Sequence, residues 1–293
     1  MLNEVTSIAV VGCGLMGSSI AKTLGAAGNN VAAWNRTSEA TNNLAAFGVA
    51  PQSSLEITIR TYDCIVLVLS NYEICRSLIT PFKEQLRGKV VVNLTSGTCE
   101  EADSFGAWMR ASEVLYLDGS IWALPKGIGQ TNTCLAYSGA RSAWERASLY
   151  LSQLGGASRF VGERFGAANA LEAAFPGTFY MTAILSFIEG IALCKAYEIS
   201  EATIMDAVAP TMDLLQGSIV QTIQKITAGD FTTTQATLQV FLDAVSSYVL
   251  NEHSPVKDSA LTTALRQTLE QICLSGFSDR DVASTISRWL KPS

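Results

Sequence analysis

Three glycines with the spacing GxGxxG are the residues of this sequence best suited to binding a phosphorylated ligand. The motif contains Gly12, Gly14, Leu15, Met16 and Gly17. An apolar run over 5–11 precedes it and a helical pattern over 15–27 follows, which is the strand–turn–helix context of a dinucleotide site. The first glycine permits a tight turn, the second lets a pyrophosphate approach the backbone, and the third lets helix and strand pack closely. The motif therefore predicts a nucleotide cofactor at a helix N-terminus, the alternative being a purely structural glycine turn.

The end of the next predicted strand, 30–34, indicates which cofactor binds. Enzymes that use NAD usually carry Asp or Glu at this point, which accepts hydrogen bonds from the ribose 2′-hydroxyl. This sequence has Asn35, Arg36 and Thr37 instead. A planar guanidinium and neutral donors suit a 2′-phosphate, which a carboxylate would repel, so we expect NADPH. In the alternative interpretation Arg36 is a solvated surface charge, and Thr37 or Ser38 only caps the next helix.

Strand and helix patterns alternate through the first half of the chain, which predicts an α/β fold. Eight segments have the character of strands, and they are 5–11, 30–34, 48–50, 63–69, 89–94, 114–118, 133–137 and 158–161. Several of them are continuous apolar runs, as expected for parallel strands that are covered on both faces. We therefore predict an N-terminal Rossmann domain over 1–162 with a doubly wound, mostly parallel sheet.

From about residue 166 the strand signal stops and helical patterns continue. A long interdomain helix is predicted over about 166–197, and shorter helices are predicted near 201–227, 232–252, 256–275 and 279–290. The second domain, 163–293, is therefore expected to be all-α and to serve substrate binding and dimerisation. Most of the circumference of the long helix is apolar. This apolar surface is larger than one small helical domain can cover, so we expect a homodimer.

Composition describes an ordered globular protein and limits its partners. The 293 residues are 48% apolar and 16% charged, enough for two domains with large cores. The net charge of -6 argues against nucleic-acid and anionic-membrane partners. Seven cysteines are scattered without a CxxC pair, which is typical of a reduced, cytoplasmic protein. The charge-free run 173–188 is too short and too polar for a membrane span of about 20 residues.

The single histidine, His253, narrows the chemistry further. A histidine-ligated zinc cluster or a Ser-His-Asp triad would depend on this one residue. Its surroundings, 251–255, are polar and typical of a surface loop. We therefore expect no metal site and no histidine-based catalysis.

Polar residues follow three predicted strands at their carboxyl ends, where open α/β sheets bind ligands. The polar strand-end residues are Ser70, Asn93, Thr95 and Asp118, and the apolar Leu69 directly precedes the first of them. We expect the cofactor beside Leu69, Ser70, Asn93 and Thr95, with Asn93 and Thr95 placed to hydrogen-bond the nicotinamide ribose or its carboxamide. Asn93 and Asp118 are also candidates for the substrate pocket. In the alternative interpretation such residues only close turns, and Thr98 with Glu101 forms a capping box for the next helix.

Together these segments resemble the imine reductases and reductive aminases, relatives of the β-hydroxyacid dehydrogenases. The resemblance is carried by 12–17, 35–37, 93–98 and 118–125, followed by Ile128-Gly129, and it covers nearly the whole chain. It implies NADPH-dependent reduction of C=N bonds by a domain-swapped homodimer. The active site would be shared between the Rossmann domain of one subunit and the helical domain of the other, with Trp122 and Tyr180 in the substrate pocket.

The decisive position in this resemblance is Glu172. In the hydroxyacid dehydrogenases a GxGxxxK segment supplies a catalytic lysine six residues after its first glycine, and the segment beginning at Gly166 places Glu172 there. A carboxylate cannot supply the lysine's positive charge, but it can hold an iminium cation by charge and hydrogen bonding. Imine reductases commonly carry Asp or Tyr at this position, so Glu172 departs from the usual pattern. The alternative role of Glu172 is an interface salt bridge.

Tyr180 is the second candidate for proton transfer. It follows Glu172 by eight residues, a little over two helical turns, so the two side chains are expected roughly on one face. Its alternative role is aromatic packing. Between them, Pro176 cannot donate to the carbonyl of residue 172, so we expect a kink or a loosened turn beside Glu172.

These observations predict a cytoplasmic, NADPH-dependent imine reductase that transfers hydride to an imine or iminium carbon, with or without condensing the amine and carbonyl itself. Two alternatives stay open. A β-hydroxyacid dehydrogenase or aldehyde reductase is disfavoured by the missing lysine. A non-catalytic NADPH-binding sensor or scaffold would need only the glycine motif.

Overall fold

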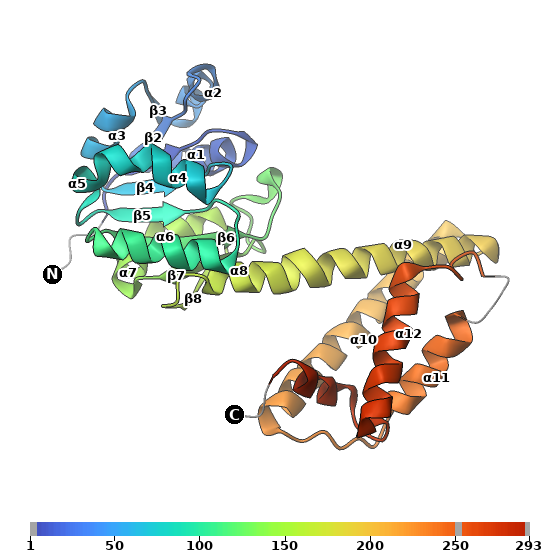
Figure 1. Ribbon diagram of the computed structural model, residues 1–293. Coiled ribbons are helices and arrows are strands. Elements are labelled where there is room, and N and C mark those ends of the chain that lie inside the picture. Colours follow the sequence, from blue (N-terminus) through green and yellow to red (C-terminus); the bar gives the residue numbers. More distant parts are fainter. Residues whose placement is uncertain (1–4, 250–253, 291–293) are drawn as a thin grey trace. The chain divides into compact units, whose positions relative to one another are not determined.

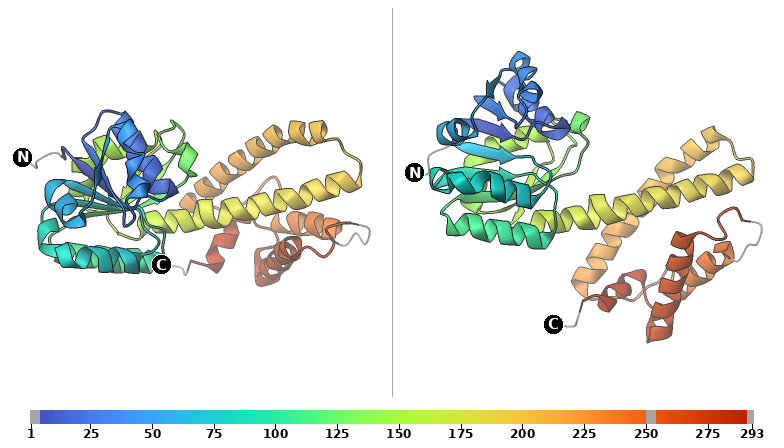
Figure 2. Two further views of the ribbon diagram at one scale, coloured as in Figure 1. Left: turned by 90° about the horizontal axis from the view of Figure 1, so that it is seen from above. Right: turned by 45° about the horizontal axis from the view of Figure 1, so that its top comes forward.

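The computed structural model describes residues 5–249 and 254–290. The chain divides into two compact units, Met1–Tyr180 and Met181–Ser293, which are coloured from blue to yellow-green and from yellow to red in Figures 1 and 2. The first unit includes the beginning of the predicted long helix, whereas the predicted domain boundary after residue 162 lies at the end of the last strand. His253 lies outside the described residues.

The first unit is built on one eight-stranded sheet. Its strands are β1 Ile8–Val11, β2 Val31–Trp34, β3 Val49–Gln52, β4 Cys64–Leu67, β5 Val90–Asn93, β6 Leu115–Ile121, β7 Leu135–Gly139 and β8 Arg159–Gly162. Their order is β3-β2-β1-β4-β5-β6-β7-β8, and neighbours are parallel except for β6 and β7. The chain turns back between β1 and β4, which creates the switch point where such sheets bind ligands. The predicted doubly wound, mostly parallel sheet is confirmed.

Helices cover both faces of this sheet. They are α1 Leu15–Ala26, α2 Glu39–Asn42, α3 Leu55–Thr61, α4 Tyr72–Ile79, α5 Lys83–Leu86, α6 Cys99–Ala111, α7 Arg141–Leu151 and α8 Ala167–Glu172. On one face α1 and α7 bury residues such as Ile20 and Leu151 against the strands. On the other face α3 to α6 bury residues such as Ile79 and Phe105, and Figure 1 shows α4 and α6 in front of the sheet. The two apolar layers hold the strand ends in fixed positions.

The strand β6 is longer than the sequence predicts. It continues past Asp118 to Ile121, because this part of the strand pairs antiparallel with β7. Asp118 lies opposite Ser138 in this pairing and Ile121 lies opposite Leu135. The prediction that Asp118 stands at a strand end is therefore wrong.

The second unit is all-α, as predicted. Its helices are α9 Tyr180–Ala196, which begins at the border of the units, α10 Glu201–Ala228, α11 Leu238–Val249 and α12 Ala260–Ile272, followed by the π-helix Cys273–Phe277 and the 3-10 helix Val282–Arg288. The predicted helix over 232–252 starts later than expected. Asp230 accepts a hydrogen bond from the Thr232 N–H and Thr233 accepts one from the Gln235 N–H, and such local bonds compete with a helix.

The predicted long helix is present as α8, a π-helical segment over Ala173–Phe179, and α9. Pro176 lies inside the π-helical segment, so the expected loosened turn beside Glu172 is confirmed. The charge-free run 173–188 alone is shorter than a membrane span, but the whole helix Ala167–Ala196 is long and apolar enough to cross a membrane by length and composition. A helix covered by other protein would meet the same criterion, so the expected lack of a membrane partner stays a prediction.

Candidate active site

A cleft of about 500 Å³ opens at the switch point of the sheet, at the carboxyl ends of β1, β2 and β4. It gathers ten of the predicted cofactor residues, namely Gly12, Gly14, Leu15, Met16, Gly17, Asn35, Arg36, Thr37, Leu69 and Ser70. Apolar side chains, Val68, Ile74 and Leu78 among them, complete its wall. Because the residues come from three separate loops, the sheet topology is what brings them together.

The glycine-rich loop has the conformation that close approach of a phosphate requires. Gly12 has a φ of 97°, in the left-handed region, and a Cβ there would collide with the Val68 carbonyl oxygen. A Cβ at Gly17 would collide with the carbonyl oxygen of Gly12. A Cβ at Gly14 would meet nothing within 4 Å and would project into open space at the start of α1. The loop therefore leaves room for a pyrophosphate beside the first N–H groups of α1.

Asn35 connects the glycine-rich loop to the residues expected at the 2′-phosphate. Its Oδ1 accepts a 3.0 Å hydrogen bond from the Cys13 N–H, and its Nδ2 donates to the Thr37 hydroxyl at 2.9 Å. Because the Thr37 oxygen accepts from Asn35, the Thr37 proton remains for a ligand. Arg36 is exposed and forms no ion pair within the described ranges. Ser38 occupies the N-cap of α2, but no capping bond from its side chain is found in the described structure.

Asn93 and Thr95, the two other predicted cofactor residues, are buried and do not line this cleft in the described structure. The Thr95 hydroxyl accepts a 3.1 Å hydrogen bond from the Leu69 N–H, which ties the loop after β5 to the loop after β4. The Asn93 Oδ1 accepts from the Thr95 N–H at 3.2 Å, the turn-closing role of the alternative interpretation. The Asn93 Nδ2 has no hydrogen-bond partner among the described residues. A buried donor that is left without a partner costs about 1–3 kcal/mol, so an internal water or another polar group is expected at this nitrogen.

Asp118 is the centre of a buried polar network and not part of an open pocket. Its carboxylate is fully buried, and it accepts hydrogen bonds from the hydroxyls of Tyr72, at 2.8 Å, and Tyr116. Burial raises the pKa of Asp118 from 3.8 to about 7, although the two hydroxyls oppose this effect. The predicted place of Asp118 in the substrate pocket is therefore corrected, because both oxygens are occupied and shielded.

Asn169 joins this network, and the sequence analysis did not single it out. Its Nδ2 donates to the Tyr72 hydroxyl at 3.1 Å and to the Gly97 carbonyl at 3.0 Å. Asn169 is buried inside α8, three residues before Glu172. A polar residue in the otherwise apolar segment between Gly166 and Glu172 was the available signal.

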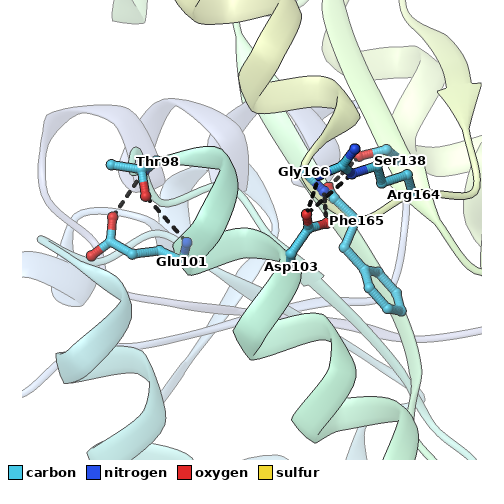
Figure 3. Close-up of polar contacts among 7 residues, drawn as sticks. All are labelled: Thr98, Glu101, Asp103, Ser138, Arg164, Phe165 and Gly166. Atoms are coloured by element: carbon cyan, nitrogen blue, oxygen red, sulfur yellow. Dashed lines mark hydrogen bonds and ion pairs between the residues drawn. The ribbon is translucent and has the colours of Figure 1, made fainter.

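Helix α6 anchors the beginning of α8. It starts with the predicted capping box of Thr98 and Glu101, which is confirmed and visible in Figure 3. One turn further, the carboxylate of Asp103 accepts a 2.9 Å hydrogen bond from the Gly166 N–H and pairs with Arg164 at 3.0 Å. These contacts fix the N-terminal end of the helix that carries Glu172.

Strands β6 and β7 anchor the next residues of α8. The Ser138 hydroxyl donates to the Phe165 carbonyl at 2.6 Å and accepts from the Ala168 N–H at 3.1 Å, and Figure 3 shows the first of these contacts. The Ser120 hydroxyl donates to the Ala168 carbonyl at 3.1 Å and accepts from the Trp122 indole N–H at 3.1 Å. The predicted pocket residue Trp122 is thus attached to the same short helix.

Glu172 is the last residue of α8 and is partly buried. Burial raises the pKa of its carboxyl. Beyond it, the ring of Phe175 lies 6.4 Å from the ring of Trp122. Tyr180 begins α9 and is 56% exposed. No hydrogen bond joins Glu172 to Tyr180 in the part of the chain that the structure describes, and their roles in proton transfer stay predictions.

The sheet, the glycine-rich loop and the basic residue after β2 define a Rossmann domain suited to NADP. The sequence signature of the NAD-binding domain of 6-phosphogluconate dehydrogenase matches residues 7–162, and that of the C-terminal domain of NADPH-dependent reductive aminase-like proteins matches residues 165–291. The chain belongs to the imine reductase and reductive aminase family. The predictions of this family and of NADP as the cofactor are confirmed.

Three similar proteins illustrate this relationship. An NADPH-dependent reductive aminase of Aspergillus oryzae is 24% identical over 283 residues, which are 95% of each chain. The imine reductase from Myxococcus stipitatus, solved in complex with NADP+, has a TM-score of 0.85 at 27% identity and covers 97% of this chain and 100% of its own. A chloroplastic glyoxylate/succinic semialdehyde reductase of Arabidopsis thaliana is 23% identical over 292 residues, 96% of this chain and 78% of that protein.

Proposed function

We propose that this protein reduces imine or iminium C=N bonds to amines with NADPH, and that it accepts imines formed from a carbonyl compound and an amine. One observation carries this proposal above the others. A partly buried carboxyl, Glu172, ends the anchored helix α8 at the position where the hydroxyacid dehydrogenases carry lysine. A negative group there favours a cationic substrate and disfavours an alkoxide.

The cleft residues supply binding and orientation. We expect the N–H groups at the start of α1 to hold the pyrophosphate, and Arg36 and Thr37 to hold the 2′-phosphate. Bound NADPH supplies the hydride. Asn93 stays a candidate for the nicotinamide side of the site, although its side chain is fully buried and does not line the cleft in the described structure.

Glu172 has two roles available in this proposal. When ionised, it stabilises the positive charge of an iminium nitrogen. When protonated, it delivers its proton to the nitrogen of a neutral imine as hydride adds to the carbon, and the raised pKa of its carboxyl extends the pH range in which it holds that proton. Tyr180 is the alternative donor, and Trp122 with Tyr180 would form the apolar wall of the substrate pocket.

We further propose that the active protein is a cytoplasmic, domain-swapped homodimer with shared active sites. Support comes from large apolar side chains that are exposed on α9 and α10 of the single chain, namely Met181, Ile184, Leu185, Phe187, Ile188, Met205, Met212, Leu214, Ile219, Val220 and Ile223. An exposed apolar surface of this extent needs a cover, and a second copy would provide the same surface in return. The seven cysteines are all free, which fits a reducing compartment.

A panel of substrates tests the proposal. NADPH absorbance is followed with cyclic imines, with ketone and amine pairs, and with short aldehydes, and NADP+ reduction is followed with β-hydroxyacids. Turnover of imines supports the proposal. Turnover confined to aldehydes or hydroxyacids would favour the second candidate, which the similarity to a semialdehyde reductase supports. Binding of NADPH without turnover of any substrate would favour a sensor or scaffold.

A further inference from the structure

The orientation of the Asn169 amide is fixed by chemistry. The Gly97 carbonyl oxygen can only accept a hydrogen bond, so the Asn169 nitrogen must face it, at 3.0 Å. The same nitrogen donates its other proton to the Tyr72 hydroxyl at 3.1 Å. Both N–H groups of Asn169 are therefore used, and both contacts are made to residues outside its own helix.

The network continues from Tyr72 to the central strands. Because Tyr72 accepts from Asn169, its own proton is directed to Asp118, whose Oδ1 lies 2.8 Å away. Asp118 is the register partner of Asn93 in the adjacent strands β6 and β5. A chain of three buried side chains thus links α8 to the strand end that carries Asn93.

Asn169 is also the anchored residue of α8 that lies nearest to Glu172. The contacts made by Asp103, Ser138 and Ser120 hold backbone atoms of residues 165–168. The next position, 169, is held by the side chain of Asn169 itself, and it lies within one helical turn of Glu172. After Glu172 the helix loosens into the π-helical segment around Pro176. In the described residues, the side-chain hydrogen bonds that hold α8 to the rest of its unit all precede Glu172, and those of Asn169 are the nearest to it.

We infer that Asn169 is a positioning residue for Glu172, and that it acts through hydrogen bonds to Tyr72 and Gly97 that fix the end of α8 relative to Asn93. This inference rests on the proposed role of Glu172 in imine reduction. Asn169 touches neither substrate nor cofactor in this account. It is buried, and its Oδ1 has no hydrogen-bond partner among the described residues.

Asn169→Leu keeps the approximate size of the side chain and removes both hydrogen bonds. We expect kcat for a cyclic imine to fall by about 10- to 100-fold, the scale for a misplaced reacting group, with a smaller change in KM and an unchanged Kd for NADPH. The acid limb of the pH profile is expected to shift toward an ordinary carboxyl pKa, because a displaced Glu172 would be better hydrated. Ser54→Ala is the matched control, since it removes the N-cap of the remote helix α3 and should alter neither kcat nor the pH profile.

Tyr72→Phe is the second variant, and it preserves the ring packing against Phe105. It breaks the same chain of hydrogen bonds, so we expect the losses of kcat in Asn169→Leu and Tyr72→Phe to be far from additive in the double variant. Additive losses, or an Asn169→Leu protein with the kcat and pH profile of the Ser54→Ala control, would overturn the inference.

Hydrogen exchange separates this inference from the proposed function. Backbone amides of residues 167–173 should exchange faster in Asn169→Leu than in wild type or Ser54→Ala, and this is measured by mass spectrometry without any turnover. Unchanged exchange contradicts the anchoring role. If exchange is faster in Asn169→Leu but wild type reduces no imine, the anchoring role of Asn169 is supported and the proposed function is refuted. The catalytic purpose of the anchoring is then refuted as well.

Discussion

The hydroxyl of Tyr72 donates a 2.8 Å hydrogen bond to the buried carboxylate of Asp118, although 46 positions separate the two residues in the chain. Tyr72 begins α4 and Asp118 lies within β6, so the contact fastens a helix to the centre of the sheet. Burial raises the pKa of Asp118 to about 7 despite this contact. Burial thus moves the pKa of a carboxyl group in the core toward neutral pH.

The titration of Asp118 predicts a pH dependence of stability. Because its pKa is raised on folding, the folded protein binds this proton more tightly than the unfolded chain. The corresponding stabilisation is fully present below pH 3.8 and is lost as the pH rises through about 7. A pKa difference of this size corresponds to roughly 4 kcal/mol in the free energy of unfolding.

Urea denaturation of wild type and Asp118→Asn at pH 5 and pH 8 measures this effect. Wild type should lose more stability than the variant between the two pH values, because only wild type carries the titrating group. The quantity compared is the change in the free energy of unfolding between pH 5 and pH 8 in each protein. The absolute stabilities are not compared, because Asn at this site also alters the hydrogen bonds to Tyr72 and Tyr116. Parallel pH dependence in the two proteins would contradict the assignment.

The residues after β2 predict the cofactor preference. NADPH should bind more tightly than NADH, and Arg36→Ala should reduce that difference by about 1.5–3 kcal/mol, the range for hydrogen bonds to charged groups. Calorimetric titration with each cofactor provides the measurement. Arg60→Ala is the control, because Arg60 is an exposed arginine on α3 that pairs with Glu56 and should leave the preference unchanged. Equal dissociation constants for NADPH and NADH in wild type would refute the prediction.

The exposed apolar side chains of α9 predict a dimer that buries well over about 2,000 Å². Light scattering at micromolar concentration should give the mass of two chains for wild type. Phe187→Asp should shift the mass toward one chain, whereas Leu149→Asp, on the exposed side of α7, should not. A stable and active wild-type monomer argues against the dimer. A protein that stays in solution only with detergent would indicate a membrane role for Ala167–Ala196 instead.

Much of the fold could be predicted because buried parallel strands are short apolar runs between turn residues. All eight strands lie where the sequence patterns place them. The error at Asp118 has a physical cause, since the extension of β6 depends on antiparallel pairing with β7, whose register no local pattern shows. The late start of α11 has a different physical cause, because local side-chain hydrogen bonds stabilise the turn around Thr232.

The glycine-rich wall of the cleft was predictable because the spacing of its three glycines has a direct structural meaning. A kink or loosened turn beside Glu172 was predictable for a similar reason, since Pro176 lacks a donor, and the structure shows it as a π-helical segment. The contacts of Asn169 were not, because they connect α8 with α4 and the loop before α6 across the fold. A buried amide in an apolar helix signals a partner, but only the structure identifies that partner as Tyr72.

Steady-state turnover of a cyclic imine by variants of Glu172 tests most directly whether this carboxyl takes part in the reaction. Glu172→Gln keeps the shape of the side chain and cannot carry its charge, so kcat should fall by about 10²- to 10⁴-fold with unchanged NADPH binding. Glu172→Lys should abolish turnover, because a lysine would repel the iminium cation. Glu163→Gln is the control, since Glu163 is exposed and pairs with Arg141. If Glu172→Gln and Glu172→Lys both turn over the imine at the wild-type rate, Glu172 is structural and the assignment of the chemistry to this helix position is wrong.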